Sequence, residues 1–192
     1  MTTRILTVDT VRAEDLDRYV RQDWTATPGL VGGWSVAFGP VTQVLFLQSA
    51  GAGDGGQGPA SAAAGFALER RERHWLQEMS PFGPGGDGIS VFELRTYDVR
   101  VGQGEEFLKL MLAALPIRQR HSANFGVWRS LSGRLEQVRH LWGYRDLAQR
   151  TAVRGQLKDD VVWGDYTRTI LPMLETLQST ILTPLPLSAA RQ

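Results

Sequence analysis

The 192-residue chain contains no cysteine and only three histidines. The lack of cysteine excludes disulfides, thiolate catalysis and Cys-based zinc or iron–sulfur sites. His74, His121 and His140 show neither the HxH nor the HxxxH spacing typical of metal sites. The sequence therefore predicts no metal and no organic cofactor, although one His as an axial haem ligand is left open.

A strong charge of one sign is also lacking. Lys and Arg total 21 against 20 Asp and Glu, which gives no reason to expect nucleic acid or an anionic membrane as partner. No apolar run approaches the ~20 residues that a membrane-spanning helix needs. The first ten residues, MTTRILTVDT, lack the apolar core of a secretory signal. We therefore expect a soluble, cytoplasmic protein whose partner is a small molecule.

The chain does contain an internal repeat. GPVTQVLFL at 39–47 and GRLEQVRHL at 133–141 share Gly, Gln, Val and Leu at an offset of 94 residues. The same offset relates Gly32 and Trp34 to Gly126 and Trp128, and an offset of 88 relates residues 9–12 to 97–100. Such agreement without a gap predicts a tandem duplication.

The repeat sets the expected domain organisation. We predict a first unit at 1–80 with a flexible Gly/Ala-rich insertion at 50–65, a Gly/Pro-rich linker at 81–89, and a second unit at 90–186. Each unit has the expected order strand, helix, strand, strand, helix, which fits a split βαβ, ferredoxin-like sheet. Because both faces of each sheet carry apolar residues, the two α+β units should pack sheet to sheet within one chain.

Three helices are expected from periodicity. Phe107, Leu110, Met111 and Ala114 form an apolar stripe on a helix that Pro116 should kink or end. A polar helix is expected around 146–158, and residues 68–79 of the first unit overlay it, so that 69–74 (ERRERH) reads as a solvated helix face. A last helix is marked by Tyr166, Ile170, Leu174 and Leu177.

The second unit resembles a NIPSNAP domain over about residues 90–186. The motifs occur in order at family-like spacing: ELRTY (93–97), PIRQRHS (116–122), FGVW (125–128), LEQVRHLWGY (135–144) and STILTPLP (179–186). The first unit resembles it weakly, since it lacks ELRTY and HLW. That family belongs to the dimeric α+β barrels, in which two ferredoxin-like units usually come from two chains. The resemblance implies a fused, intrachain barrel; a further homodimer is left open.

Candidate site residues gather in the second unit. On one strand Glu93, Arg95 and Tyr97 share a face, and on a later strand His140, Trp142 and Tyr144 do so. If Phe92 and Leu94 meet the helices, the polar face points into the barrel. The first unit has Ile5, Thr7, Asp9, Phe46 and Gln48 at the places of Glu93, Arg95, Tyr97, His140 and Trp142.

These residues suggest chemistry on a flat, oxygenated molecule. Arg95 would polarise a carbonyl or enolate, while Glu93 or His140 moves a proton. The predicted substrate contacts are Tyr97, Trp128, Trp142, Tyr144 and Arg118. Simpler interpretations stay open: Glu93 and Arg95 pair only with each other, His140 is a hydrogen-bonded core residue, Trp34 and Trp128 are core packing, and Arg118 complements a helix dipole.

Two functions remain in competition. The first is a cofactor-independent enzyme of bacterial-type secondary metabolism that rearranges, cyclises or oxygenates a polycyclic or polyketide-like substrate inside the barrel. The second is a non-catalytic ligand-binding or protein-interaction module. The enzyme hypothesis predicts an enclosed pocket lined by Glu93, Arg95, Tyr97 and His140, whereas a filled barrel without a cavity would contradict it.

Overall fold

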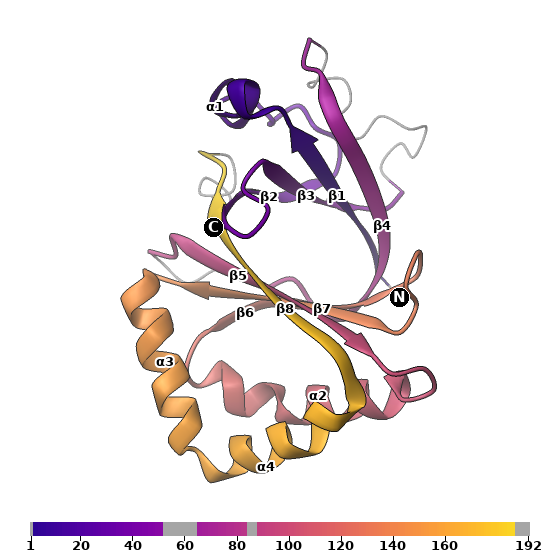
Figure 1. Cartoon of the computed structure of the whole chain (residues 1–192), viewed down its shortest axis with the longest axis vertical. Helices are drawn as coiled ribbons and strands as arrows, with labels where there is room; N and C mark the ends of the chain where they lie inside the picture. The colour runs from indigo at the N-terminus through magenta and orange to yellow at the C-terminus, as the bar shows by residue number, and fades with distance from the viewer. Residues whose placement is uncertain (1, 52–64, 84–87, 187–192) are drawn as a thin grey trace.

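The protein is an antiparallel β-barrel of eight strands, seen in a computed structural model that describes residues 2–51, 65–83 and 88–186 (Figure 1). The strands are β1 (Thr3–Val11), β2 (Leu30–Phe38), β3 (Gln43–Ser49), β4 (Leu68–Ser80), β5 (Val91–Val99), β6 (Ala123–Ser130), β7 (Gln137–Tyr144) and β8 (Leu174–Pro184). The helices are α1 (Leu16–Val20), α2 (Gly104–Gln119), α3 (Leu147–Asp159) and α4 (Val161–Ile170), with short 3-10 turns at Ala13–Asp15 and Leu171–Met173. Most of the predicted insertion at 50–65 and part of the predicted linker lie outside the described residues.

The two halves of the barrel have the same strand order. One half runs β4-β1-β3-β2 and the other β8-β5-β7-β6, and the pairs β2–β8 and β4–β6 join them into a closed ring. Their registers agree as well, because Ile5 lies opposite Gln48 and Glu93 lies opposite Trp142. The predicted fold of two ferredoxin-like units in one intrachain barrel is thus confirmed, while the duplication event itself stays a prediction.

Apolar side chains fill the barrel interior. Trp34 and Trp128 lie there with Phe92 and leucines from both halves, and the remaining cavity is only about 20 Å³. Each Trp ring folds over the Gly two residues before it: a Cβ on Gly126 would lie 2.4 Å from the Trp128 ring, and one on Gly32 equally close to Trp34. The repeated Gly-x-Trp motif therefore makes room for a large ring in the shared core, which confirms the core-packing interpretation.

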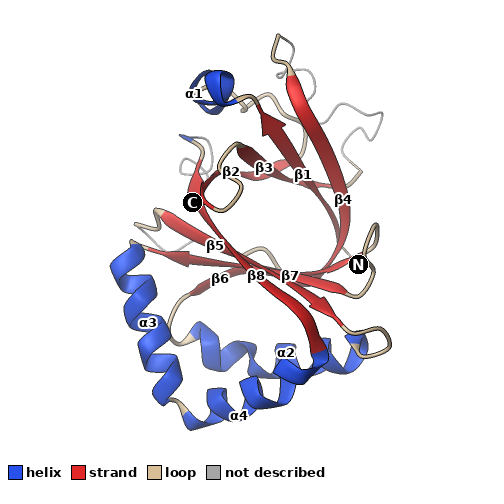
Figure 2. Cartoon of the chain, in the orientation of Figure 1, coloured by secondary structure: helices blue, strands red, loops and turns tan. Residues whose placement is uncertain are grey.

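The helices lie outside the barrel and are distributed unequally. Helices α2, α3 and α4 cover the outer face of the β5–β8 half, whereas the described part of the other half carries the short α1 and the 3-10 turn before it (Figure 2). Residues three or four positions apart bury one side of α2 against the sheet, among them Phe107, Met111 and Leu115. None of the helices in the described part of the chain is long and apolar enough to cross a membrane.

One predicted helix and the end of another are instead strands, and both strands complete the barrel. Residues 68–79 form β4, which pairs with β1 on one side and β6 on the other, so ERRERH lies on a strand and Arg70 pairs with Glu72 two residues away. Mixed charges suit a helix and an exposed strand equally, so pairing with distant strands decides the outcome. The last helix ends at Ile170, and Leu174 and Leu177 already belong to β8, which is rich in β-branched residues.

Of the two outcomes expected for Pro116, a kink or the end of the helix, the second is wrong. Helix α2 continues to Gln119 with Pro116 inside it. Arg118 therefore lies within the last turn of α2, on the side that faces the sheet, and it is buried. This extra turn brings its guanidinium under the strands of the second half.

Candidate small-molecule binding site

A cavity of about 510 Å³ lies between the outer face of the β5–β8 half and helices α2 to α4. Its polar lining comes from the strands and the ends of the helices, and aromatic and aliphatic side chains form the rest of the wall. The lining residues are Glu93, Arg95, Tyr97, Met111, Leu115, Arg118, His140, Trp142, Arg154, Leu157, Lys158, Trp163, Gly164, Tyr166, Thr167, Ile170, Leu171 and Leu177.

The polar strand face points toward the helices, and the prediction that it points into the barrel is wrong. Phe92 and Leu94 pack in the barrel core, whereas Glu93, Arg95 and Tyr97 line the cavity outside it. The reason is that the ring of strands encloses a core shared by both halves, which must be apolar, while the helices meet the sheet only in part. The filled barrel contradicts an active site inside it, yet the predicted polar residues do share one cavity.

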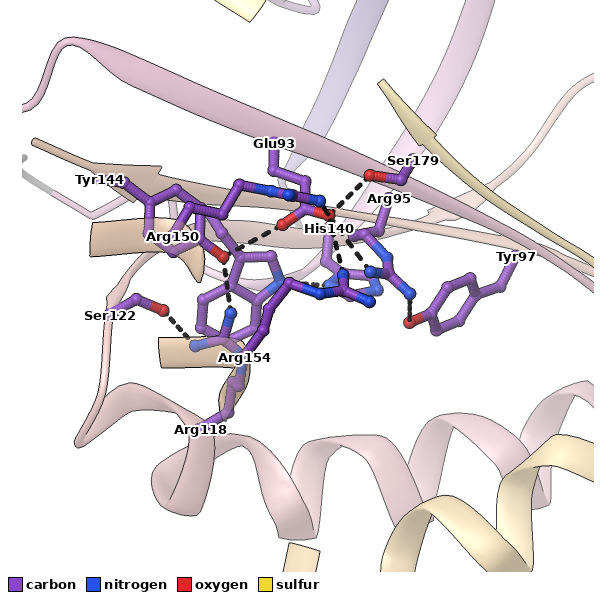
Figure 3. A network of polar contacts seen from close by, with 11 residues as sticks. Glu93, Arg95, Tyr97, Arg118, Ser122, His140, Tyr144, Arg150, Arg154 and Ser179 are labelled. Carbon is purple, nitrogen blue, oxygen red and sulfur yellow. Dashed lines mark hydrogen bonds and ion pairs between the residues drawn. The ribbon is translucent and has the colours of Figure 1, made fainter. Parts of the chain in front are cut away.

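Glu93 is the centre of a dense polar network (Figure 3). Its Oε1 accepts hydrogen bonds from Ser179 Oγ at 2.6 Å, Arg150 Nη2 at 2.8 Å and Arg95 Nη1 at 3.1 Å, and its Oε2 accepts one from the Tyr144 hydroxyl at 3.1 Å. Arg154 adds an ion pair at 3.6 Å. Strand β5 thereby holds α3 and β8 through one carboxylate that is only 1% exposed.

This environment fixes the charge of Glu93. Burial on its own raises the pKa of the carboxyl, but hydrogen bonds from Arg150 and Ser179 and the charge of Arg95 outweigh it, so the pKa lies well below its usual range. Both oxygens already accept hydrogen bonds. Glu93 is therefore a permanently charged anchor for arginines and is poorly suited to take up a proton.

His140 lies opposite Arg95 in the β5–β7 pairing and presents one unused nitrogen. Its Nδ1 accepts a hydrogen bond from Trp142 Nε1, so a neutral ring carries its proton on Nε2. Burial, followed by the charge of Arg95, lowers the pKa of His140 well below 6.5, which keeps the ring neutral. Nε2 has no partner among the described residues, so His140 offers an unsatisfied N–H donor in the cavity wall.

Arg118 is a buried cation that reaches from the last turn of α2 to strand β7. Its guanidinium donates to Ser122 Oγ and, at 2.6 Å, to the Tyr144 hydroxyl, and it lies 4.4 Å above the Trp142 ring. Burial lowers the pKa of Arg118, and no carboxylate in the described part of the chain forms an ion pair with it. Arg118 is thus more than the helix-end charge of the simpler interpretation.

The remaining predicted residues divide between the cavity and the barrel. Tyr97 and Trp142 line the cavity, and Tyr97 accepts a hydrogen bond from Arg95. Tyr144 does not line it but links Arg118 to Glu93 through its hydroxyl. Trp128 lies in the barrel core and does not contribute to the cavity.

Sequence reasoning missed the wall formed by α3 and α4. Arg150, Arg154 and Lys158 recur every four residues on α3, so they form one basic stripe, of which Arg154 and Lys158 line the cavity and Arg150 pairs with Glu93. That spacing was visible in the sequence and could have revealed the stripe. Trp163 and Tyr166 on α4 could not be assigned to the site, because only the packing of α4 against α2 brings them there.

Aromatic side chains occupy the equivalent place in the described part of the first half. Phe46 occupies the position of His140, and Trp24 and Tyr19 pack against it with ring centroids 4.6 Å and 6.4 Å away. Asp9, at the position of Tyr97, accepts hydrogen bonds from Tyr19 and Arg71. Aromatic packing therefore fills the space that the second half leaves open.

A metal site is not supported by the described residues, among which no three His, Asp or Glu side chains lie close enough to hold an ion. The polar groups that converge on the cavity are mainly guanidinium, hydroxyl and imidazole N–H donors. Such a set binds oxygen atoms of an organic ligand and not a cation.

Known proteins share the half of the chain that carries this cavity. The NIPSNAP family model matches residues 92–189, which is just over half of the sequence. The chain belongs to the NIPSNAP family. Every residue that lines the cavity falls within the matched range, so the candidate site is a feature of the NIPSNAP domain.

The curated relatives are longer proteins. NipSnap homolog 3B of Mus musculus is 36% identical over 101 residues, which make up 51% of this chain and 40% of that protein. NipSnap homolog 2 of Homo sapiens is 32% identical over 101 residues, 53% of this chain and 35% of that protein. The chain thus spans well under half the length of these relatives, and the match concerns the NIPSNAP domain.

Solved structures resemble either the NIPSNAP half or the whole barrel. A NIPSNAP family protein of Agrobacterium tumefaciens matches at a TM-score of 0.52 with 29% identity, covering 58% of this chain and all of that one. A putative monooxygenase of Lactobacillus acidophilus matches 96% of this chain and 94% of its own length at a TM-score of 0.68, with 10% identity. The second likeness establishes the fold alone.

Proposed function

We propose that this NIPSNAP protein binds a small organic molecule in the cavity between the β5–β8 sheet and helices α2 to α4. The observation that carries the proposal is the cavity itself, whose volume of about 510 Å³ falls in the range of small-molecule sites. It combines apolar walls with two buried polar atoms that have no partner among the described residues, namely His140 Nε2 and Arg95 Nε. Buried donors without partners are costly, so a ligand that supplies acceptors would be stabilised there.

A pair of matched substitutions tests whether this cavity is the binding site. Leu177 is partly exposed at the edge of the cavity, so Leu177→Trp should obstruct it without disturbing the core. Leu135, equally an exposed leucine but remote from the cavity lining, serves as the control in Leu135→Trp. A screen of small aromatic and polycyclic compounds by ligand-observed NMR should give hits that Leu177→Trp loses and Leu135→Trp keeps. Hits that survive in both variants would place binding elsewhere.

A cofactor-independent enzyme that rearranges, cyclises or oxygenates a polycyclic substrate is the second candidate. It is favoured by the adjacency of Arg95 and His140, whose N–H groups could together stabilise negative charge on a carbonyl oxygen or enolate. In this scheme His140 donates a hydrogen bond and Glu93 positions Arg95, so neither is the proton acceptor that the sequence suggested.

Oxygen uptake with a polycyclic ketone such as anthrone tests the catalytic candidate. His140→Phe installs the residue that the first half has at this place. Loss of about 100-fold or more in rate with little change in binding is expected if the imidazole stabilises the transition state, since one such donor contributes on this scale. If the wild-type rate equals the rate without protein, the catalytic function is contradicted and only the binding function remains.

A further inference from the structure

The cavity has an excess of positive charge. Its lining contains one carboxylate, Glu93, against the guanidinium groups of Arg95, Arg118 and Arg154 and the ammonium group of Lys158. Glu93 is already engaged by Arg95, Arg150 and Arg154. No further acidic side chain among the described residues belongs to the lining, so the lining carries more positive than negative charge.

The excess of positive charge has its largest energetic cost at Arg118. The side chain is buried and contacts the neutral hydroxyls of Ser122 and Tyr144 and the face of Trp142, whereas Glu93 acts on it only at longer range, without an ion pair. The carbonyl end of α2 offsets part of the cost of burying a cation. A buried cation is nevertheless stabilised fully only by a neighbouring anion, and the cavity provides the space for one.

Lys158 places a further positive charge at the exposed edge of the cavity. It lies on the basic stripe of α3, and among the described residues it forms no ion pair. The charge of Lys158 at the edge and that of Arg118 deeper in the cavity together create an electric field that attracts an anion inward.

The remaining residues of the cavity wall indicate what kind of apolar group the ligand carries. Trp142, Trp163 and Tyr166 supply flat rings, and Met111, Leu115 and Leu157 add aliphatic surface. Such walls favour a planar apolar group of a size that fits about 510 Å³.

We propose that the ligand is an organic carboxylate with a flat apolar body, whose carboxylate pairs with Arg118 and is drawn in past Lys158. This rests on the proposed binding function and adds the charge of the ligand. The carboxylate also accepts a hydrogen bond from His140 Nε2–H, and the ring system packs against Trp142 and Trp163.

Calorimetric titration with carboxylate and amide pairs tests the proposal on the full chain. The panel runs from benzoate and 2-naphthoate to anthracene-2-carboxylate, each beside its neutral amide of nearly equal shape. We expect at least one carboxylate to bind ten-fold or more tightly than its amide, and this preference to shrink at high salt. Equal binding of acid and amide would overturn the charge proposal while the binding function stands. No binding by any member would overturn both.

Substitutions then locate the charge preference. Arg118→Met should abolish the preference for the acid and leave amide affinity within about two-fold, whereas Arg118→Lys should keep part of it. Lys158→Met, at an exposed position, tests the same field without risk to folding and should reduce the preference several-fold. Lys109→Met, at an exposed position of α2 outside the cavity lining, is the control and should bind as wild type. Unchanged preference in both Arg118→Met and Lys158→Met would contradict the proposal.

Discussion

Glu93 shows how a single carboxylate determines the state of its surroundings. Three arginines, a serine and a tyrosine converge on it, and its pKa is lowered because hydrogen bonds and positive charge outweigh burial. The site is therefore a positively charged cavity with one internal anion, and not a pair of groups poised to exchange a proton.

The substitution Glu93→Gln should destabilise the protein in a pH-dependent way. Breaking a buried ion-pair network by removing one partner costs about 3 kcal/mol, so chemical denaturation at pH 7 should show a loss of this order. Because the pKa of Glu93 is depressed in the folded state, its stabilising effect is complete above the pKa of the unfolded chain, about 4.3, and is lost as pH falls toward the lower folded value. The difference between variant and wild type should therefore shrink below pH 4.

Glu175→Gln is the matched control, since Glu175 pairs with Arg134 at a partly exposed position. Its loss should stay below about 1 kcal/mol at any pH. If Glu93→Gln were as mild as Glu175→Gln at pH 7, Glu93 would not be the anchor described above.

Which residues form the site was predictable from strand alternation, but which way they point was not. Glu93, Arg95 and Tyr97 share a face because alternate residues of a strand do, and the cavity contains all three. Their direction depends on which face of the sheet is sealed by the other half, and this information lies in distant strands. The Phe46 and His140 contrast was visible in the sequence, although only packing shows that Phe46 fills a space that His140 leaves open.

At the scale of elements, the cavity depends on how α3 and α4 are set against the sheet. The two helices meet at Asp160, whose side chain caps α4 by accepting a hydrogen bond from the Trp163 backbone N–H at 2.9 Å. Trp163 lies in the first turn of α4 and forms part of the cavity wall. The cap therefore links helix stability to the shape of the site.

Asp160→Ala should weaken both the fold and ligand binding. Loss of an N-cap costs about 1 kcal/mol, and a frayed first turn would leave Trp163 less well placed. Thermal unfolding measures the first effect and calorimetric titration the second. Asp160→Asn, which keeps a capping oxygen, should resemble wild type in both; an alanine variant that matches it would show that the cap has no such role.

Helices and strands were predicted correctly where local sequence signals determine them. They were predicted incorrectly where closure of the barrel determines them. The polar helix expected around 146–158 is α3, capped by Asp146. Residues 68–79 and 174–184 carry patterns compatible with helix or strand, and they become β4 and β8 because each bridges two other strands. Barrel closure depends on pairing between strands that lie far apart in the sequence, so no short segment of sequence predicts it.

At the scale of the whole molecule, the two halves complete one another. Strands β8 and β6 of the second half pair with β2 and β4 of the first, and the apolar interior is shared. Residues 90–186 alone would expose two strand edges and half of this core. We therefore expect this half, produced by itself, to associate into a dimer that rebuilds a barrel, as measured by light scattering after size exclusion. A folded, stable monomer would contradict this expectation.

The division of roles between the halves follows from their outer faces. Aromatic packing closes the outer face of the first half, so it serves mainly as the partner sheet. The second half carries three helices, a basic stripe and the cavity. We expect substitutions such as Phe46→Leu to affect stability and leave ligand affinity unchanged.

A crystal structure of the protein soaked with 2-naphthoate would locate the ligand. We expect density for it between the β5–β8 sheet and helices α2 to α4, with its rings against Trp142 and Trp163 and its carboxylate toward Arg118. Ligand bound inside the barrel or on the outer surface, with the cavity left empty, would contradict this expectation.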